Sequence, residues 1–186
     1  MDAKELQQEL LGILRKKFGN LNVEKEWDPA KGSQDDYHRQ LYCPRVDLAV
    51  SPFNKIHNSQ ERENILKAVR ENQDFIEKLK EVSYHINFKE SENPRCFLAI
   101  EIEASGSRKH HLGDITNASI LGAVGIIITL DKEGSSTIYN GFKRTRDYLK
   151  FATDNNKIES TLANNLLIIR SEDFIRILKE ELEEQS

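Results

Sequence analysis

Three acidic residues of this chain lie in segments whose apolar residues alternate as they do in β-strands. Asp47 is in the middle of one segment, and Glu101 and Glu103 are near the end of another. Glu101 and Glu103 are two positions apart, so they share one face of a strand, and Asp47 can converge on Glu101 if the two strands are neighbours. Mg2+ prefers carboxylate oxygens, and the backbone carbonyl of Ile102 offers a further oxygen. Such a ligand set supports the activation of water and the polarisation of a phosphoryl oxygen.

The polar segment after the acidic pair has residue types that hold phosphate groups. It combines hydroxyls, cations and a histidine at a turn and the start of a helix, namely Ser105, Ser107, Arg108, Lys109 and His110. Backbone N–H groups at a helix N-terminus bind phosphate oxygens together with such side chains. Ordinary capping and a polar helix face account for these residues equally well. His110 and His111 are adjacent, so they point about 100° apart on a helix and do not predict a zinc site.

A second basic segment lies further along the chain. Lys143, Arg144 and Arg146 lie there between Phe142 and Tyr148. This basic and aromatic mixture suits contact with a nucleic-acid backbone. A solvated helix face explains the segment almost as well.

The elements that must position these residues follow from the periodicity of the apolar residues. Strands are expected at residues 23–27, 41–53, 96–104, 124–130 and 166–170, with Pro52 ending the second of them. Helices are expected at the N-terminus as far as Gly19, at 58–81, 108–122 and 140–153, and after Ser171 as the N-cap. This order predicts an α/β fold, with an antiparallel meander first and parallel crossovers later. We expect one domain over residues 1–186, with a helical insertion at about 58–81.

The composition is that of a soluble globular protein, because 38% of the residues are hydrophobic and 31% are charged. The net charge of -4 counts against a simple DNA-coating protein, but it allows an enzyme with a local basic surface. Cys43 and Cys96 have neither the number nor the spacing of a disulfide framework or a zinc site. No stretch approaches the roughly 20 apolar residues that span a bilayer, so we expect a cytoplasmic protein without a membrane partner.

At its acidic residues the chain resembles the PD-(D/E)XK nuclease superfamily. The family pattern is a proline and an aspartate near one strand, followed on the next strand by an acidic residue, any residue and a lysine. The matching residues are Pro44, Asp47, Glu101, Ile102 and Glu103. The order of the expected elements over roughly residues 5–130 is also similar. The resemblance implies a restriction-endonuclease-like fold, with a mixed central sheet flanked by helices, and metal-dependent cleavage of phosphodiester bonds in DNA.

The resemblance also assigns metal ligands. It implies that Asp47, Glu101 and the carbonyl of Ile102 hold Mg2+ or Mn2+. The first helix of the superfamily sometimes adds a carboxylate, for which Glu9 or Glu5 is the candidate here. A merely solvated glutamate is the alternative at both positions.

The sequence departs from the family pattern in two ways. Two residues separate the motif proline from Asp47, which the family tolerates because the proline is not a ligand. Glu103 stands where the family usually has lysine, although some type II restriction enzymes resemble this chain in having glutamate there. Glu103 would then act as a base or hold the attacking water, or Lys109 or His110 would supply the missing group. Asn117 falls on the helical face of His110, where family members often place a polar residue toward the site.

Two alternatives remain open. A protein that kept the nuclease fold and lost its chemistry would bind DNA, or serve as an assembly module, without metal-dependent cutting. An unrelated α/β protein would use the acidic strand end structurally, and its Asp47 and Glu101 carboxylates would lie far apart. A restriction or defence role follows from the resemblance by analogy alone, and a homodimer is expected because many such enzymes dimerise to cut two strands.

Overall fold

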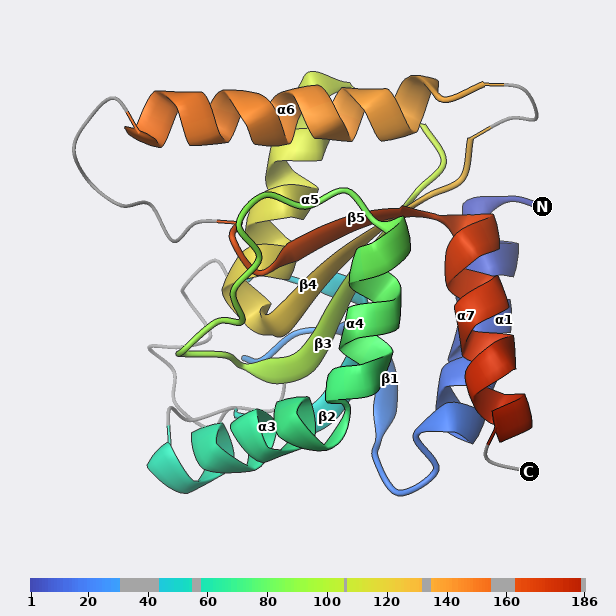
Figure 1. Ribbon diagram of the computed structural model, residues 1–186, viewed down its shortest axis with the longest axis vertical. Helices are drawn as coiled ribbons and strands as arrows, with labels where there is room; N and C mark the ends of the chain where they lie inside the picture. The colour runs from blue at the N-terminus through green and yellow to red at the C-terminus, as the bar shows by residue number, and fades with distance from the viewer. Residues whose placement is uncertain (31–43, 55–57, 106, 132–134, 155–162, 185–186) are drawn as a thin grey trace.

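The computed structural model describes residues 1–30, 44–54, 58–105, 107–131, 135–154 and 163–184 (Figure 1). The strands are β1 (Val23–Trp27), β2 (Val46–Phe53), β3 (Cys96–Glu103), β4 (Gly122–Thr129) and β5 (Leu166–Arg170). The helices are α1 (Ala3–Lys17), α3 (Ser59–Glu71), α4 (Gln73–Val82), α5 (Arg108–Leu121), α6 (Thr137–Asp154) and α7 (Ser171–Glu184).

The five strands form one mixed sheet in the order β1-β2-β3-β4-β5. The pairs β1-β2 and β2-β3 are antiparallel, whereas β3-β4 and β4-β5 are parallel. Each parallel pair needs a crossover, and α5 and α6 provide the two crossovers. The predicted α/β class, with a meander followed by crossovers, is therefore confirmed.

Helices cover both faces of the sheet. The larger hydrophobic core lies between the sheet and the helices α1, α3, α4 and α7, and it contains Ile126 and Ile128 of β4. Ile127 of the same strand points to the opposite face, where it packs against apolar residues of α5 and α6. Because alternate residues of β4 meet helices on both sides, every residue of this strand is buried. Figure 1 shows α1 and α7 side by side, and α6 lying across one end of α5.

Several predicted boundaries are wrong. The single helix expected at 58–81 is two helices, because Asn72 ends α3 by donating from both its backbone N–H and its side chain to Ala68 O. Pro52 does not end β2, since Phe53 still pairs with Cys96 after a shift of register. Ser171 is the first residue of α7, which follows β5 directly.

Some predictions fall wholly or partly outside the described residues. These are Cys43 and the first residues of the strand expected from residue 41. None of the helices in the described part of the chain combines the length and the apolar composition needed to cross a bilayer.

Candidate active site

Asp47 and Glu101 lie where the hydrogen-bonded ladder between β2 and β3 ends. The two strands pair as far as Leu48 and Ile100. Beyond that pair, Asp47 Oδ2 accepts a hydrogen bond from the backbone N–H of Ile102 at 2.7 Å. In return, the backbone N–H of Asp47 donates to Glu101 Oε2 at 3.3 Å. Each carboxylate thus binds the backbone of the opposite strand, and the structure brings the two predicted metal ligands together.

Asn117 connects α5 to this pair of carboxylates. Its side-chain amide donates to Glu101 Oε1 at 3.2 Å and to the backbone carbonyl of Arg45 at 3.3 Å. Both oxygens of Glu101 therefore accept hydrogen bonds, one from β2 and one from α5. Asn117, a minor candidate in the sequence, fixes the orientation of the Glu101 carboxylate.

Glu103 and Asp114 form a second pair of carboxylates beside the first. Glu103 is half-buried, and its Oε1 accepts a hydrogen bond from the backbone N–H of Ser105 at 2.7 Å. Asp114 lies on α5, and its buried Oδ2 has no hydrogen-bond donor among the described residues. Burial raises the pKa of Asp114, and the charge of the neighbouring Glu103 raises it further. Sequence analysis missed Asp114, although it is three residues before Asn117 and therefore on a neighbouring part of the helix surface.

Burial and mutual repulsion make these carboxyls hard to ionise. Burial, followed by the charges of Asp47 and Asp114, raises the pKa of Glu101 to about 9. Burial and the charges of Glu103 and Asp47 raise the pKa of Asp114 to about 7. Burial also raises the pKa of Asp47, against the lowering effect of its bond to Ile102. A cation bound among these groups would remove much of this unfavourable interaction.

Asp47 also lines a cavity of about 460 Å3 between α1 and the edge of the sheet. It is lined by Ala3, Lys4, Gln7, Gln8, Lys25, Glu26, Asp47 and Ile102. The side chain of Gln7 donates to the backbone carbonyl of Asp47 at 3.0 Å and to Glu26 Oε1 at 3.1 Å. The contribution of α1 to the site is therefore an amide, which the sequence analysis did not single out.

The two acidic candidates in α1 are placed elsewhere. Glu9 is two residues after Gln7, about 200° further around the helix, and it does not line the described cavity. Glu5 forms a capping box with Asp2, in which each side chain accepts from the backbone of the other residue. Glu5 thus stabilises the start of α1.

The site offers oxygen donors, which suit Mg2+ or Mn2+ better than softer metals. Asp47 and Glu101 lie together, and Asp47 binds the backbone N–H of Ile102, the residue whose carbonyl is the third predicted donor. Asp114 adds a buried oxygen without a hydrogen-bond donor among the described residues. As they stand, no three His, Cys, Asp or Glu side chains of the described residues are grouped to hold a metal ion. The donors fit the chemistry of the metal, and the carboxylates must turn from their backbone partners to bind it.

The predicted phosphate-binding segment surrounds the start of α5. Ser107 is the N-cap residue, and its side chain makes no capping hydrogen bond. Ser105, Lys109 and His110 are exposed. Arg108 is the first residue of α5, close in sequence to the acidic strand end.

The three predicted cations of α6 have different surroundings. The ammonium group of Lys143 lies 4.6 Å from the ring centre of Tyr84. Arg146 is only 2% exposed and donates to Asn164 Oδ1 at 3.1 Å. Arg144 alone of the three is exposed at the surface.

No protein-family model, curated protein or solved structure matches this chain.

Proposed function

We propose that the chain is a metal-dependent nuclease of the PD-(D/E)XK type, with a restriction-endonuclease-like form of its α/β fold, that hydrolyses phosphodiester bonds in DNA. The observation that supports this proposal is the contact between Asp47 and Glu101 at the end of neighbouring strands. An unrelated protein with a structural acidic strand end is expected to have these carboxylates far apart, whereas here they lie at the ends of neighbouring strands. Burial and the nearby charge of Asp47 make Glu101 hard to ionise. A pair of carboxyls kept in such an unfavourable arrangement favours a cation site.

Asp47, Glu101 and the carbonyl of Ile102 would hold the Mg2+ or Mn2+ ion. When bound, the ion supplies electrostatic stabilisation of the phosphoryl group and the leaving oxygen. Glu101, with a pKa of about 9, must release its proton before it binds a cation at neutral pH. Asn117 donates to one oxygen of Glu101 and keeps this side chain at the end of β3.

Glu103 replaces the family lysine and would accept a proton from the attacking water. Burial raises the pKa of its neighbour Asp114 to about 7, so Asp114 can take up a proton near neutral pH. The positive charge that the family lysine usually supplies would come from Lys109 at the start of α5, or the adjacent His110 would serve as the proton acceptor; both residues are exposed. Ser105, Ser107 and Arg108 would contact the DNA backbone in the same region.

A nuclease fold without chemistry is the second candidate. Two observations favour it. Glu103 stands in the lysine position, and three carboxylate oxygens of Asp47 and Glu101 already accept hydrogen bonds from the protein. This candidate predicts DNA binding without metal-dependent cutting.

A cleavage assay separates the two candidates. Supercoiled plasmid and single-stranded circular DNA are incubated with the protein in Mg2+, in Mn2+ and in chelator. The test variant is Asp47→Asn, whose amide oxygen can still accept the bond from Ile102. The control is Glu81→Gln, which removes an exposed carboxylate from α4. We expect metal-dependent cutting that Asp47→Asn abolishes and Glu81→Gln retains. Intact DNA in every condition, or equal cutting by Asp47→Asn, would overturn the proposal.

A further inference from the structure

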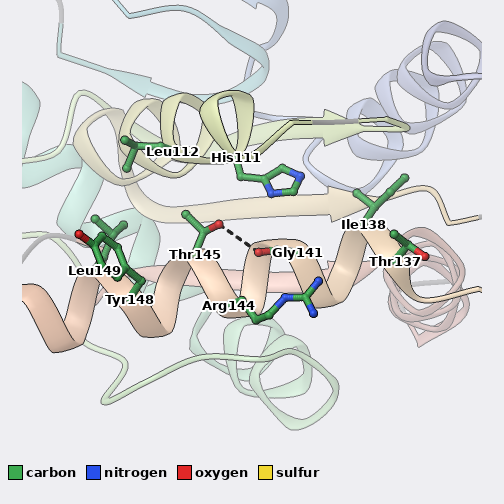
Figure 2. Close-up of a pocket in the computed structure, with 9 residues that line it drawn as sticks. All are labelled: His111, Leu112, Thr137, Ile138, Gly141, Arg144, Thr145, Tyr148 and Leu149. Carbon is green, nitrogen blue, oxygen red and sulfur yellow. Dashed lines mark hydrogen bonds between the residues drawn. The ribbon is translucent and has the colours of Figure 1, made fainter.

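A second cavity, of about 560 Å3, lies between α5 and α6 (Figure 2). Its size is within the roughly 300–1,000 Å3 of small-molecule sites. It is lined by His111, Leu112, Thr137, Ile138, Gly141, Arg144, Thr145, Tyr148 and Leu149. The proposed nuclease mechanism uses none of these residues, and the sequence alone suggests a nucleic-acid contact for Arg144.

The cavity has an apolar end with an exposed aromatic ring. Figure 2 shows Leu112, Tyr148 and Leu149 together at one end. Tyr148 is 67% exposed and Leu112 is 45% exposed, so apolar surface at the mouth is open to solvent. A flat ring at the mouth of an apolar cavity is suited to stacking against a planar ligand.

Arg144 supplies the only charge among the described residues that line the cavity. Its guanidinium is exposed and makes no ion pair with any residue that the structure describes. The acidic residue nearest to it in α6, Asp147, accepts a hydrogen bond from the hydroxyl of Tyr84 instead. The cavity therefore favours a ligand with an anionic group.

His111 lines the cavity with a polar ring that lacks hydrogen-bond partners among the described residues. It is 4% exposed, and neither ring nitrogen has a partner among the described residues. The ring lies 4.1 Å from the ring of Phe142, centre to centre, and its edge faces Gly141. A buried imidazole without partners costs free energy. Because the ring lines the cavity, a ligand that has a donor and an acceptor can supply a partner for one of its nitrogens.

The cavity adjoins the acidic site. His111 and Asp114 are three residues apart on α5, so their side chains are neighbours along the helix. The charge of Glu103 acts on the pKa of His111, although burial is the larger effect and lowers that pKa. A ligand in the cavity is thus about one helical turn from the carboxylates of the proposed active site.

We propose that this cavity receives an unpaired nucleobase of the substrate strand, with an adjacent phosphate at Arg144. A nucleotide is complementary to the cavity, because it has a planar ring for Tyr148, hydrogen-bonding groups for His111 and an anion for Arg144. This inference rests on the proposed nuclease function and adds the class of substrate. A base within a duplex cannot enter the cavity without being flipped out, so the protein acts on single-stranded or locally unpaired DNA in preference to duplex.

The test measures binding of a fluorescent twelve-nucleotide single strand, and of the matching duplex, by anisotropy in chelator. We expect the single strand to bind roughly tenfold or more tightly than the duplex. Tyr148→Ala and Arg144→Gln should each weaken binding of the single strand by about fivefold to tenfold. Arg70→Gln is the matched control, because Arg70 is an exposed arginine on α3, and it should bind as the parent chain does.

His111→Leu separates a binding role from a structural one. It should weaken binding of the single strand, while its thermal midpoint stays equal to or above that of the parent chain because two unpaired nitrogens are removed. Equal affinity for single strand and duplex, or unchanged binding in Tyr148→Ala and Arg144→Gln, would overturn the inference. A dimer that Tyr148→Ala dissociates would also overturn it, because a second copy would then cover the cavity. Selective binding of the single strand without any cleavage would refute the nuclease proposal and leave the nucleotide site standing.

Discussion

The carboxylate of Asp47 accepts a hydrogen bond from the amide that follows Glu101, and the carboxylate of Glu101 accepts one from the amide of Asp47. These two bonds join β2 to β3 beyond the last backbone pair of the ladder. They hold two carboxyls together inside the protein, where burial raises the pKa of both and the charge of Asp47 further raises the pKa of Glu101. The protein keeps this costly arrangement at the position where the proposed chemistry requires ligands.

The first prediction concerns stability and pH. The pKa of Glu101 is about 9 in the folded chain, compared with 4.5 for an ordinary glutamate. Between these values the folded state keeps a proton that the unfolded state has released, so stability falls as pH rises through this window. Glu101→Gln removes this dependence, and at pH 8 we expect the variant to be more stable by about 1 kcal/mol or more in chelator.

Urea denaturation at intervals from pH 5 to pH 9 measures this effect. Glu81→Gln, on the exposed surface of α4, should keep the slope of the parent chain. Parallel curves for Glu101→Gln and the parent chain would show that Glu101 ionises normally.

The second prediction concerns Asn117. Its hydrogen bond lowers the pKa of Glu101 against the effect of burial. Asn117→Ala removes that bond, so the pKa of Glu101 should rise further. NMR titration of side-chain carboxyl carbons in glutamate-labelled protein measures the shift. A lower or unchanged pKa would mean that Asn117 does not orient Glu101.

The third prediction concerns the contact between α5 and α6. A Cβ atom at Gly141 would lie 2.5 Å from Cε1 of His111, whose ring is packed against Phe142. Alanine normally stabilises a helix relative to glycine, but here the steric conflict should dominate, and Gly141→Ala should cost about 1–2 kcal/mol. In a double-mutant cycle His111→Ala should remove this cost. Additive effects of the two substitutions would argue against the conflict.

The fourth prediction concerns the buried ion pair between α1 and α7. Lys17 pairs with Glu181, and the side chain of Lys17 is 4% exposed. Glu181→Gln leaves this ammonium group without its carboxylate, so chemical denaturation should show a loss of about 3–5 kcal/mol. Adding Lys17→Met should restore much of the loss, because an apolar chain of similar length removes the uncompensated charge. Failure of this rescue would mean that Glu181 acts mainly through Lys78, its second partner.

The sequence predicts the fold well where apolar runs are long. β4 and β5 were expected because continuous apolar segments suit strands covered on both faces, and the structure shows both. The break at Asn72 was not expected, because neither glycine nor proline interrupts the helical periodicity there. Only the hydrogen bonds of Asn72 in the structure reveal it.

The site is harder to predict from the sequence than the fold, because it depends on how the helices and strands are rotated against each other. The neighbouring positions of Asp47 and Glu101 follow from an antiparallel meander, but their contact depends on the register of β2 and β3. Asp114 and Gln7 face the site because of the rotation of α5 and α1, which periodicity does not determine. The sequence favours a surface position for Arg146, but this residue is buried. Periodicity alone does not determine how α6 is rotated against the sheet.

The most direct test of the central claim, that Asp47 and Glu101 together bind a divalent cation, is calorimetric titration with Mn2+ at pH 7.5 in two buffers of different ionisation enthalpy. We expect binding with net proton release from Glu101, an affinity that rises by up to about tenfold per pH unit, and at least about tenfold weaker binding in Asp47→Asn. Absence of binding between pH 7 and 9, or equally tight binding by Asp47→Asn, would contradict the proposed cation site.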